Sequence, residues 1–369
     1  MGSLLALNVA LGPELERALR HCVERREAFC VVNQRLSPRG RAEELDALGA
    51  TAVWDGHQRR PRGGGHGVDD AVGLVMLTSG SSGAPKAVEM TWDALLASAT
   101  LTQRRLRHDA ESIWFPCLPA NHIGGLAVVL RSIFTDATLL WARPDELELA
   151  ARHGATHVAV VRAHLTRHDL SGYTTVLLGG AHPPSTLGEN VVTTWGMTET
   201  GSGVVYDGIP LPGVEVTSVA GELAVRSPTL FRSYRTSERP RILGPDGRDD
   251  WFPTGDAGDV VDGRVLVRGR LGFVISTGGE KVWPEDLEAA IGTLDTVRDV
   301  AVTSAPDPEW GERVIALVVG DGSPMDDAIK AVAGDRIGPW AKPKEIRYVA
   351  AIPRTANGKI RRADLPHLH

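Results

Sequence analysis

Residues 77–86 combine glycines, hydroxyl side chains and a lysine in the order Leu-Thr-Ser-Gly-Ser-Ser-Gly-Ala-Pro-Lys. Glycines let backbone N–H groups curl round an anion, hydroxyls donate further hydrogen bonds, and Lys86 supplies a positive charge. The stretch is not a Walker A loop, because Pro85 stands where that pattern needs glycine and Ala87 where it needs serine or threonine. It is either a phosphate-binding loop or a plain connecting loop of similar composition.

A hydroxyl and a carboxylate stand together at Thr198 and Glu199, shortly after Gly196. A site for Mg²⁺ and a nucleotide needs such groups, because Mg²⁺ prefers hard oxygen ligands and bridges phosphate oxygens. The same residues could simply begin a capped helix. A metal role at this position therefore depends on a phosphate site elsewhere in the chain.

Three further groups follow toward the C-terminus. Asp256 comes after a Thr-Gly pair and is either a partner for two ribose hydroxyls or the end of an Asx-turn. Gly278 and Gly279 precede Pro284, and the proline with the acids after it explains a helix start but not the two glycines. Lys359 lies on a glycine turn near the C-terminus, where a lysine is usually solvated. Taken singly, each group has a structural explanation.

Length and composition limit the classes of protein that fit. A chain of 369 residues predicts two or three domains, and 42% hydrophobic with 23% charged residues is typical of a soluble globular protein. The net charge of -6 argues against nucleic acid as the main partner. No apolar run approaches the roughly 20 residues that cross a bilayer, and the N-terminus lacks the basic start of a signal peptide. Three cysteines without C-x-x-C spacing favour a reduced, cytoplasmic setting.

The elements that must position these groups can be read from hydrophobic periodicity. The phosphate loop is expected between a buried strand at 71–76 and a helix at 88–96, with Thr91 as candidate N-cap. We expect a helix at 12–29, a strand at 29–32, a loop at 59–67, a helix at 126–134 and a strand at 156–161. Alternation of helix and strand up to about 200 predicts a layered α/β domain with mainly parallel sheets.

The sequence pattern changes after about residue 205. Short runs rich in Val, Gly and Pro at 214–216, 221–225 and 264–267 predict a small β-rich subdomain. The tail then predicts a helix near 284–294, strands near 298–304 and 313–319, a helix near 324–337 and an extended segment at 345–349. These elements indicate a compact α+β C-terminal domain.

The order of the motifs from 75 to 362 resembles that of the adenylate-forming superfamily, which includes acyl-CoA synthetases, peptide-synthetase adenylation domains and beetle luciferases. The resemblance rests on the phosphate loop, Trp-Gly-Met-Thr-Glu-Thr at 195–200, Thr-Gly-Asp at 254–256, Gly-Arg at 269–270, the glycine pair at 278–279 and Pro-Arg-Thr-Ala-Asn-Gly-Lys-Ile at 353–360. It implies an enzyme that activates a carboxylic acid with ATP and Mg²⁺ to an acyl-adenylate and then passes the acyl group to a thiol.

The resemblance implies a role for each matching residue. The β- and γ-phosphates would be held by Thr78, Ser79, Gly80, Ser81, Ser82, Gly83 and Lys86. The adenine side would be formed by Gly179, Gly180, Ala181, Trp195 and Gly196, and the ribose would be bound by Asp256 and Arg270. Thr198 would contact the α-phosphate, Glu199 would hold Mg²⁺, and Lys359 would bridge the attacking carboxylate and the α-phosphate.

The resemblance also implies two domains, 1–270 for ATP and acid binding and a mobile 271–369 that carries Lys359. This second domain would rotate after adenylation and present Gly278 and Gly279 to the thiol of coenzyme A. The family usually has Asp or Lys at the hinge, where this chain has Gly272; glycine permits rotation, but the usual polar contacts are lost. Trp195 replaces a common tyrosine and keeps an aromatic surface while losing a hydroxyl.

The chain is short for this superfamily, and compact members of this kind are found among the o-succinylbenzoate-CoA ligases of menaquinone biosynthesis. Residues 118–126 also resemble a segment of those ligases that flanks the acyl pocket. We therefore expect o-succinylbenzoate as the acid, with His122, Thr200 and Ser202 as candidate acid-binding residues; His122 could equally be a core residue or a helix cap. The alternatives are another aryl- or acyl-CoA ligase, an adenylation enzyme that loads a carrier protein, and a non-catalytic adenylate-binding protein. The resemblance suggests a cytoplasmic enzyme, often dimeric, whose partners are a small acid and CoA.

Overall fold

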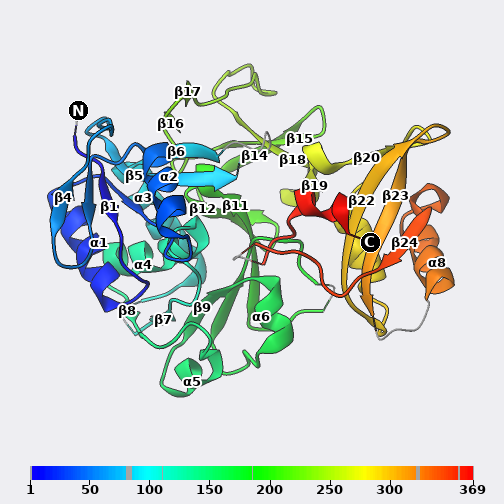
Figure 1. Cartoon of the computed structure of the whole chain (residues 1–369), viewed down its shortest axis with the longest axis horizontal. Coiled ribbons are helices and arrows are strands. Elements are labelled where there is room, and N and C mark those ends of the chain that lie inside the picture. Colours follow the sequence, from blue (N-terminus) through cyan, green and yellow to red (C-terminus); the bar gives the residue numbers. More distant parts are fainter. Residues whose placement is uncertain are drawn as a thin grey trace. The chain divides into compact units, whose positions relative to one another are not determined.

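The computed structural model describes residues 2–79, 85–109, 111–184, 186–320, 325–355 and 358–368 (Figure 1). The chain divides into two compact units. The first contains Met1–Gly180, Gly188–Val216 and Val225–Phe252; the second contains Ala181–Leu187, Thr217–Ala224 and Pro253–His369. The predicted domain boundary between 270 and 271 stays a prediction.

The first unit contains an eight-stranded sheet in the order β17-β16-β6-β5-β2-β1-β3-β4. Its centre, β5-β2-β1-β3, is parallel, and antiparallel strands extend both edges. The strands are β1 Leu5–Leu7, β2 Phe29–Val31, β3 Ala52–Trp54, β4 Arg59–Pro61, β5 Val72–Ser79, β6 Pro85–Thr91, β16 Ser233–Tyr234 and β17 Ser237–Glu238. The helices of this part of the chain are α1 Pro13–Arg25, α2 Pro38–Leu48 and α3 Trp92–Leu106. The strand β4 falls within the segment predicted as a loop.

The phosphate loop joins two strands, so the predicted order of strand, loop and helix is wrong at its last step. The run 85–91 is β6, which pairs antiparallel with β5 from Val72↔Thr91 to Ser79↔Pro85. Val88 and Met90 are fully buried on either side of the half-buried Glu89, and this period-two pattern suits a strand. The helix begins only at Trp92. Thr91 is its N-cap as predicted, since its Oγ1 accepts a hydrogen bond from the Ala94 N–H at 3.1 Å.

A seven-stranded sheet in the order β13-β12-β11-β10-β9-β7-β8 forms the other layer of the first unit. Its strands are β7 Ile113–Phe115, β8 Thr138–Leu139, β9 His157–Val160, β10 Thr175–Leu178, β11 Val191–Met197, β12 Ser202–Tyr206 and β13 Ile209–Pro210. The helical elements are α4 Ile123–Thr135, α5 Leu147–Arg152, α6 Arg162–Arg167 and the 3₁₀ turn η1 Thr198–Thr200. The neighbouring strands β8, β7, β9, β10 and β11 are parallel. The segments that follow β10 and β11 therefore leave the sheet at the same edge, where the carboxyl ends of the strands lie.

A buried polar cluster lies in the first unit beneath α4. The Arg131 guanidinium is stacked 4.7 Å from the centre of the Trp114 ring, and Trp114 in turn lies 4.9 Å from the His157 ring. His108 packs edge-on against the same tryptophan. Burial, together with the charge of Arg131, lowers the pKa of both His108 and His157 to about 4. Both histidines are therefore neutral in the folded protein at physiological pH.

These two histidines should make the fold sensitive to mild acid. An unfolded histidine titrates near pH 6.5, so stability is fully present above that pH and is lost as pH falls toward 4, because only the unfolded chain then takes up the protons. We expect a loss on the order of 2–3 kcal/mol per histidine over this window. Urea unfolding at pH 7 and pH 5 should show a smaller pH effect in His157→Asn than in the wild type. The exposed His153→Asn is the control; equal pH effects in all three proteins would contradict the prediction.

A four-stranded sheet in the order β14-β15-β18-β19, in which β18 and β19 pair antiparallel, confirms the β-rich subdomain. Its strands are β14 Glu215–Val219, β15 Glu222–Arg226, β18 Phe252–Val261 and β19 Arg264–Arg270. The C-terminal part of the second unit is the predicted α+β arrangement, with β20, β21, β22, β23 and β24 in one sheet and α7 and α8 packed on its core. Its elements are η2 Leu271–Phe273, β20 Ile275–Thr277, β21 Glu280–Val282, α7 Pro284–Ile291, β22 Val297–Asp307, β23 Gly311–Gly320, α8 Asp326–Arg336, η3 Pro339–Ala341, β24 Glu345–Tyr348 and η4 Arg362–His367.

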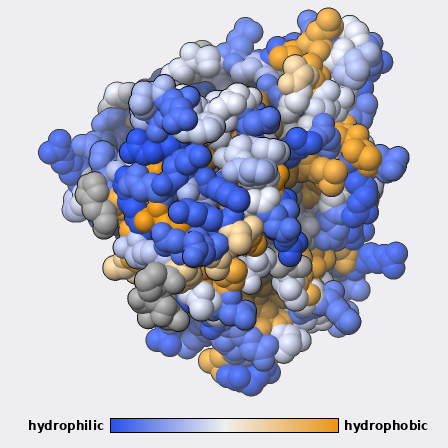
Figure 2. Space-filling model, turned by 90° about the vertical axis from the view of Figure 1, so that its right-hand side faces the viewer, coloured by the Kyte–Doolittle hydropathy of each residue, from blue (hydrophilic) through white to orange (hydrophobic). Residues whose placement is uncertain are grey.

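The surface agrees with the composition of a globular protein. Figure 2 shows a face on which hydrophilic side chains predominate and hydrophobic ones lie in scattered groups. Among the helices that the structure describes, none is long and apolar enough to cross a membrane.

Candidate active site

The two ends of the phosphate loop are fixed by the β5–β6 hairpin. Thr78 and Lys86 are cross-strand partners, and the Thr78 hydroxyl donates to the Lys86 carbonyl oxygen at 3.3 Å. The hairpin therefore holds both residues at the base of the loop. The predicted residues Gly80, Ser81, Ser82 and Gly83, and the side chain of Ser79, lie outside the described residues.

Tyr234 links the phosphate loop to the predicted metal ligand. The Lys86 ammonium group lies 5.1 Å from the centre of the Tyr234 ring, and the Tyr234 hydroxyl donates to Glu199 Oε1 at 3.2 Å. The strand β16 brings Tyr234 there by pairing with β6, where Tyr234 lies opposite Val88. The Glu199 carbonyl oxygen also accepts from the Phe231 N–H at 2.8 Å. Two groups far apart in sequence, the cation predicted to bind phosphate and the carboxylate predicted to bind Mg²⁺, thus share one partner, which was not predicted from the sequence.

The turn η1 contains Thr198 and Glu199, and hydrogen bonds of Thr200 stabilise it. The Thr200 hydroxyl is buried, accepts from the Met197 N–H at 2.8 Å and lies 2.7 Å from the Ser202 carbonyl oxygen. This gives Thr200 a structural role in the turn. Ser202 is also buried, and it lies opposite Met197 where β12 begins.

The glycines of this region allow close packing of the backbone. A Cβ at Gly196 would lie 2.1 Å from the Ser202 carbonyl oxygen, so only glycine fits between β11 and β12 at this bulge. A Cβ at Gly179 would lie 2.8 Å from Thr194 Oγ1. Gly179 and Gly180 follow β10, and Trp195 lies on the neighbouring β11, half-exposed. The loop predicted to bind adenine therefore runs beside the strand that carries Trp195. Ala181 is assigned to the second unit.

His122 is the N-cap residue of α4 and lines a cavity. Its side chain makes no cap hydrogen bond and lies 3.3 Å from the Asn121 amide nitrogen. The cavity has a volume of about 250 Å³ and is also lined by Thr78 and Glu44. Burial raises the pKa of Glu44. Two residues predicted from separate motifs, Thr78 and His122, thus face the same space.

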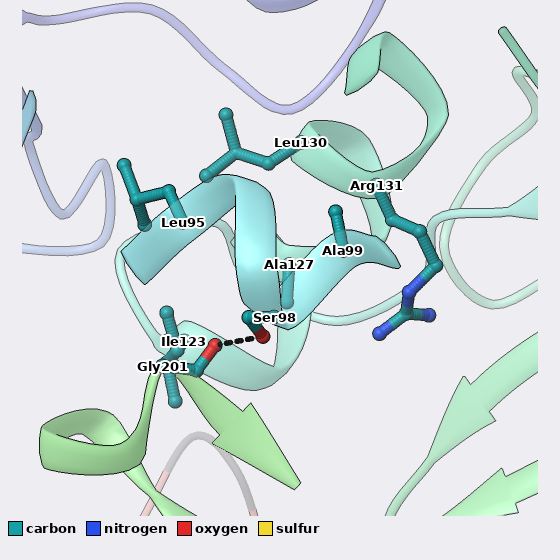
Figure 3. A pocket seen from close by; sticks show the side chains of 8 residues that line it. All are labelled: Leu95, Ser98, Ala99, Ile123, Ala127, Leu130, Arg131 and Gly201. Carbon is teal, nitrogen blue, oxygen red and sulfur yellow. Dashed lines mark hydrogen bonds between the residues drawn. The ribbon is translucent and has the colours of Figure 1, made fainter. Parts of the chain in front are cut away.

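A second, smaller pocket of about 10 Å³ lies between α3 and α4 (Figure 3), which is room for roughly one water molecule. The Ser98 hydroxyl of α3 donates to the Gly201 carbonyl oxygen at 2.9 Å, so α3 holds the end of the turn η1. Ile123 and Ala127 of α4 form another wall, and Arg131, whose guanidinium stacks on Trp114, lies at one side of the pocket. The contact of α3 with this turn was not predicted from the sequence.

In the second unit, Asp256 and Arg270 form an ion pair. They are cross-strand partners on β18 and β19, and Arg270 Nε lies 2.8 Å from Asp256 Oδ1. Arg270 also donates from Nη1 to the Thr254 carbonyl oxygen at 2.8 Å. Asp256 is therefore a strand residue oriented by an arginine, rather than the end of an Asx-turn.

The glycine pair and the lysine also belong to the second unit. Gly278 and Gly279 form the turn between β20 and β21, with φ of +60° and +85°, values that favour glycine. Lys359 is exposed on a turn whose backbone closes through the Thr355 N–H, which donates to the Lys359 carbonyl oxygen at 2.7 Å.

The first unit offers the groups that Mg²⁺ and phosphates require. Glu199 supplies a carboxylate, Thr198 and Thr78 supply hydroxyl groups, and Lys86 supplies a cation. Over the described residues, no group of three or more His, Cys, Asp or Glu side chains gathers to hold a metal. One carboxylate suffices where phosphate oxygens complete the coordination of Mg²⁺, so these residues fit a metal that arrives with a nucleotide.

Comparison with known proteins identifies the family. The family model described as AMP-binding enzyme matches residues 16–235, and that of the AMP-binding enzyme C-terminal domain matches residues 286–359. A probable 2-succinylbenzoate–CoA ligase of Mycobacterium tuberculosis is 36% identical over 337 residues, covering 82% of this chain and 85% of that protein. A 2-succinylbenzoate–CoA ligase of Enterococcus faecalis is 28% identical over 334 residues, covering 79% of this chain and 68% of that protein. The chain belongs to the family of AMP-binding enzymes.

Solved structures share the fold. An o-succinylbenzoate CoA synthetase from Bacillus subtilis, in complex with its acyl-adenylate intermediate, matches with a TM-score of 0.83 and 22% identity, over 99% of this chain and 88% of that chain. ATP-bound MatB from Rhodopseudomonas palustris matches with a TM-score of 0.84 and 20% identity, over 100% of this chain and 88% of that chain. These matches confirm the predicted fold class, but at such identities they do not choose between acids.

Proposed function

We propose that this chain is an ATP-dependent acid-CoA ligase that works through an acyl-adenylate, with o-succinylbenzoate as its acid. The observation that carries the proposal is the contact of Lys86 and Glu199 with the same tyrosine, Tyr234, because it brings the cation proposed to bind phosphate close to the carboxylate proposed to bind Mg²⁺. The choice of acid is supported by the identity of 36% to the mycobacterial 2-succinylbenzoate–CoA ligase. Such an enzyme belongs to menaquinone biosynthesis.

In the first half-reaction, the acid carboxylate attacks the α-phosphorus of ATP and pyrophosphate leaves. Thr78, Lys86 and the loop between them would hold the leaving phosphates, and Thr198 would donate a hydrogen bond to the α-phosphate. Mg²⁺ held by Glu199 would offset phosphate charge. Lys359 would lie between the attacking carboxylate and the α-phosphate, where its ammonium group stabilises the negative charge that develops.

The nucleoside and the acid would be held by the other predicted residues. Gly179, Gly180, Ala181, Trp195 and Gly196 would line the adenine, and His122 with Ser202 would flank the acid. In the second half-reaction, the CoA thiol attacks the acyl carbon and AMP leaves. Gly278 and Gly279 would line its approach, because glycines let a narrow thiol pass close to the backbone.

Asp256 would accept hydrogen bonds from the ribose hydroxyls, with Arg270 orienting its carboxylate. We expect Asp256→Asn to raise KM for ATP roughly tenfold to a hundredfold, the range of a lost charge-assisted hydrogen bond pair. 2′-Deoxy- and 3′-deoxy-ATP should be poorer substrates for the wild type but no worse than ATP for the variant.

The matched control for this prediction is Asp259→Asn on the same strand, which breaks an exposed pair with Arg268 at 2.6 Å. Its KM for ATP should stay at the wild-type value. Equal KM changes in the two variants, or undiminished discrimination against deoxy-ATP in Asp256→Asn, would argue against the ribose role.

Release of pyrophosphate with a panel of acids tests the proposal. We expect o-succinylbenzoate to support faster release than benzoate or a fatty acid. A better rate with another acid would overturn only the choice of substrate, and transfer to a carrier protein instead of CoA would favour a carrier-loading enzyme. No release with any acid would favour a non-catalytic adenylate-binding protein.

The proposal includes a cytoplasmic location and the predicted homodimer. Cys22, Cys30 and Cys117 are buried and unpaired, which supports a reducing compartment. Sedimentation of the purified protein would test the dimer.

A further inference from the structure

The turn that carries Lys359 is closed by its own backbone. Arg354 and Ile360 form an isolated antiparallel bridge, and the Lys359 N–H donates to Thr355 Oγ1 at 3.2 Å. The Gly358 N–H donates to the Thr355 carbonyl oxygen at 2.9 Å. These bonds shape the turn but do not attach it to the sheet of the second unit.

Ile360 packs against the apolar core of that sheet, and the Arg354 guanidinium adds a polar attachment. From Nη1 it donates to the Gly358 carbonyl oxygen at 2.7 Å, directly beside Lys359. From Nη2 and Nε it donates to both carboxylate oxygens of Asp299 on β22, at 2.6 and 3.3 Å. Asp299 Oδ1 accepts in addition from the Val300 N–H at 2.9 Å. The Arg354 side chain therefore ties the peptide next to Lys359 to β22, at a residue 55 positions earlier in the sequence.

Arg362 anchors the chain just beyond the turn. It donates to Glu285 at 2.9 Å and to Glu288 at 3.0 Å, both on α7, and to the Val302 carbonyl oxygen of β22 at 2.9 Å. All three charged side chains are largely buried, with exposed fractions of 14%, 19% and 11% for Arg362, Glu285 and Glu288. The segment before Lys359 and the segment after it are thus fixed to the same body.

We propose that Arg354 is a positioning residue for Lys359 in acyl-adenylate formation, with Arg362 as the second anchor. This inference rests on the proposed role of Lys359. A lysine acts at the reacting atoms only when its backbone is held, since a displacement of about 1 Å can lower a rate roughly a hundredfold. A guanidinium suits this task because its planar fork fixes a carboxylate and a carbonyl oxygen at set angles, which an ammonium group does not.

A positioning role and a merely stabilising role predict different kinetics. Arg354 is not among the residues proposed to hold ATP, the acid or CoA, so its loss should lower kcat for adenylation and leave KM unchanged. Attack of CoA on a supplied acyl-adenylate does not use Lys359, so this step should not change. A stabilising residue would instead affect both half-reactions together or only the melting temperature.

The test compares Arg354→Gln with Arg361→Gln in the full chain. Arg361 is a matched control because it lies in the same segment but pairs with the nearby Asp364 at an exposed surface. We expect adenylation by Arg354→Gln to fall at least tenfold in kcat, with KM for ATP and thioester formation from o-succinylbenzoyl-adenylate within twofold of wild type. Arg361→Gln should match the wild type in all three measurements.

Asp299→Asn weakens the same Arg354–Asp299 contact by changing the acceptor, and it replaces Arg354→Gln as the test variant if Arg354→Gln does not fold. It should reproduce the selective loss of adenylation, and the double variant should be no worse than Arg354→Gln. An unchanged adenylation rate in these variants, or an equal loss of both half-reactions, would overturn the inference about Arg354. The proposed function would still hold in that case, provided that the wild type is active. A wild type that forms no acyl-adenylate would instead overturn the proposed function, and the inference with it.

Discussion

Replacing Lys359 by alanine is expected to lower the rate of acyl-adenylate formation by about 10²- to 10³-fold, the usual effect of removing a group that stabilises charge in the transition state. Thioester formation from a supplied acyl-adenylate should stay within a few fold of wild type. The reason is that the proposed lysine acts only while the carboxylate attacks the α-phosphate. Single-turnover measurements of the two half-reactions would separate these effects.

The control for this variant is Lys330→Ala on α8, which removes a lysine of the same unit that has no proposed role. It should leave both half-reactions unchanged. If Lys359→Ala slows both half-reactions equally, the assignment of one lysine to one half-reaction is wrong, and with it the predicted rotation of the C-terminal domain after adenylation.

Replacing Glu199 by glutamine should have an effect of similar size on adenylation, roughly 10²-fold, and should also change its dependence on Mg²⁺. An amide is a weaker ligand for a hard cation than a carboxylate, so more Mg²⁺ should be needed for half-maximal rate. Titration of the adenylation rate with Mg²⁺ at fixed ATP measures this shift.

Two variants make the Glu199 result specific. Tyr234→Phe removes only the hydroxyl that donates to Glu199, so we expect a severalfold loss, in line with about 1 kcal/mol for one hydrogen bond. Glu189→Gln, at an exposed position, should behave as the wild type. An unchanged Mg²⁺ requirement in Glu199→Gln would remove this residue from the metal site.

Local patterns predicted several of the elements near the site. The apolar run at 126–134 indicated α4, which extends from Ile123 to Thr135. The glycine pair at 278–279 indicated a turn before a helix but not the strands β20 and β21 that it joins, and the order of strands and helices after residue 284 is as expected. These features depend on periodicity and turn chemistry within a few residues, which a sequence displays directly.

The errors arise where pairing partners decide the structure. The run 88–96 was predicted as a helix, but its first residues pair with β5, and only the part from Trp92 onward is helical. In a short apolar run, strand and helix periods are hard to separate, and cross-strand bonds settle the outcome. Tyr234 was missed for a similar reason, since its place beside Lys86 and Glu199 follows from the pairing of β16 with a strand far away in sequence.

Residue type alone also could not show which hydroxyls are available. Thr198 and Thr200 are alike in the sequence, but the buried hydroxyl of Thr200 is bonded within its own turn. The resemblance implied a ribose contact for both Asp256 and Arg270 but not their ion pair, which follows from the strand register.

The most direct test of the account is to incubate the purified chain with ATP, Mg²⁺, CoA and o-succinylbenzoate and to identify the products by mass spectrometry. The account predicts o-succinylbenzoyl-CoA, AMP and pyrophosphate in equal amounts, with little thioester from benzoate. Formation of ADP in place of AMP, or no CoA thioester while AMP and pyrophosphate accumulate, would contradict it.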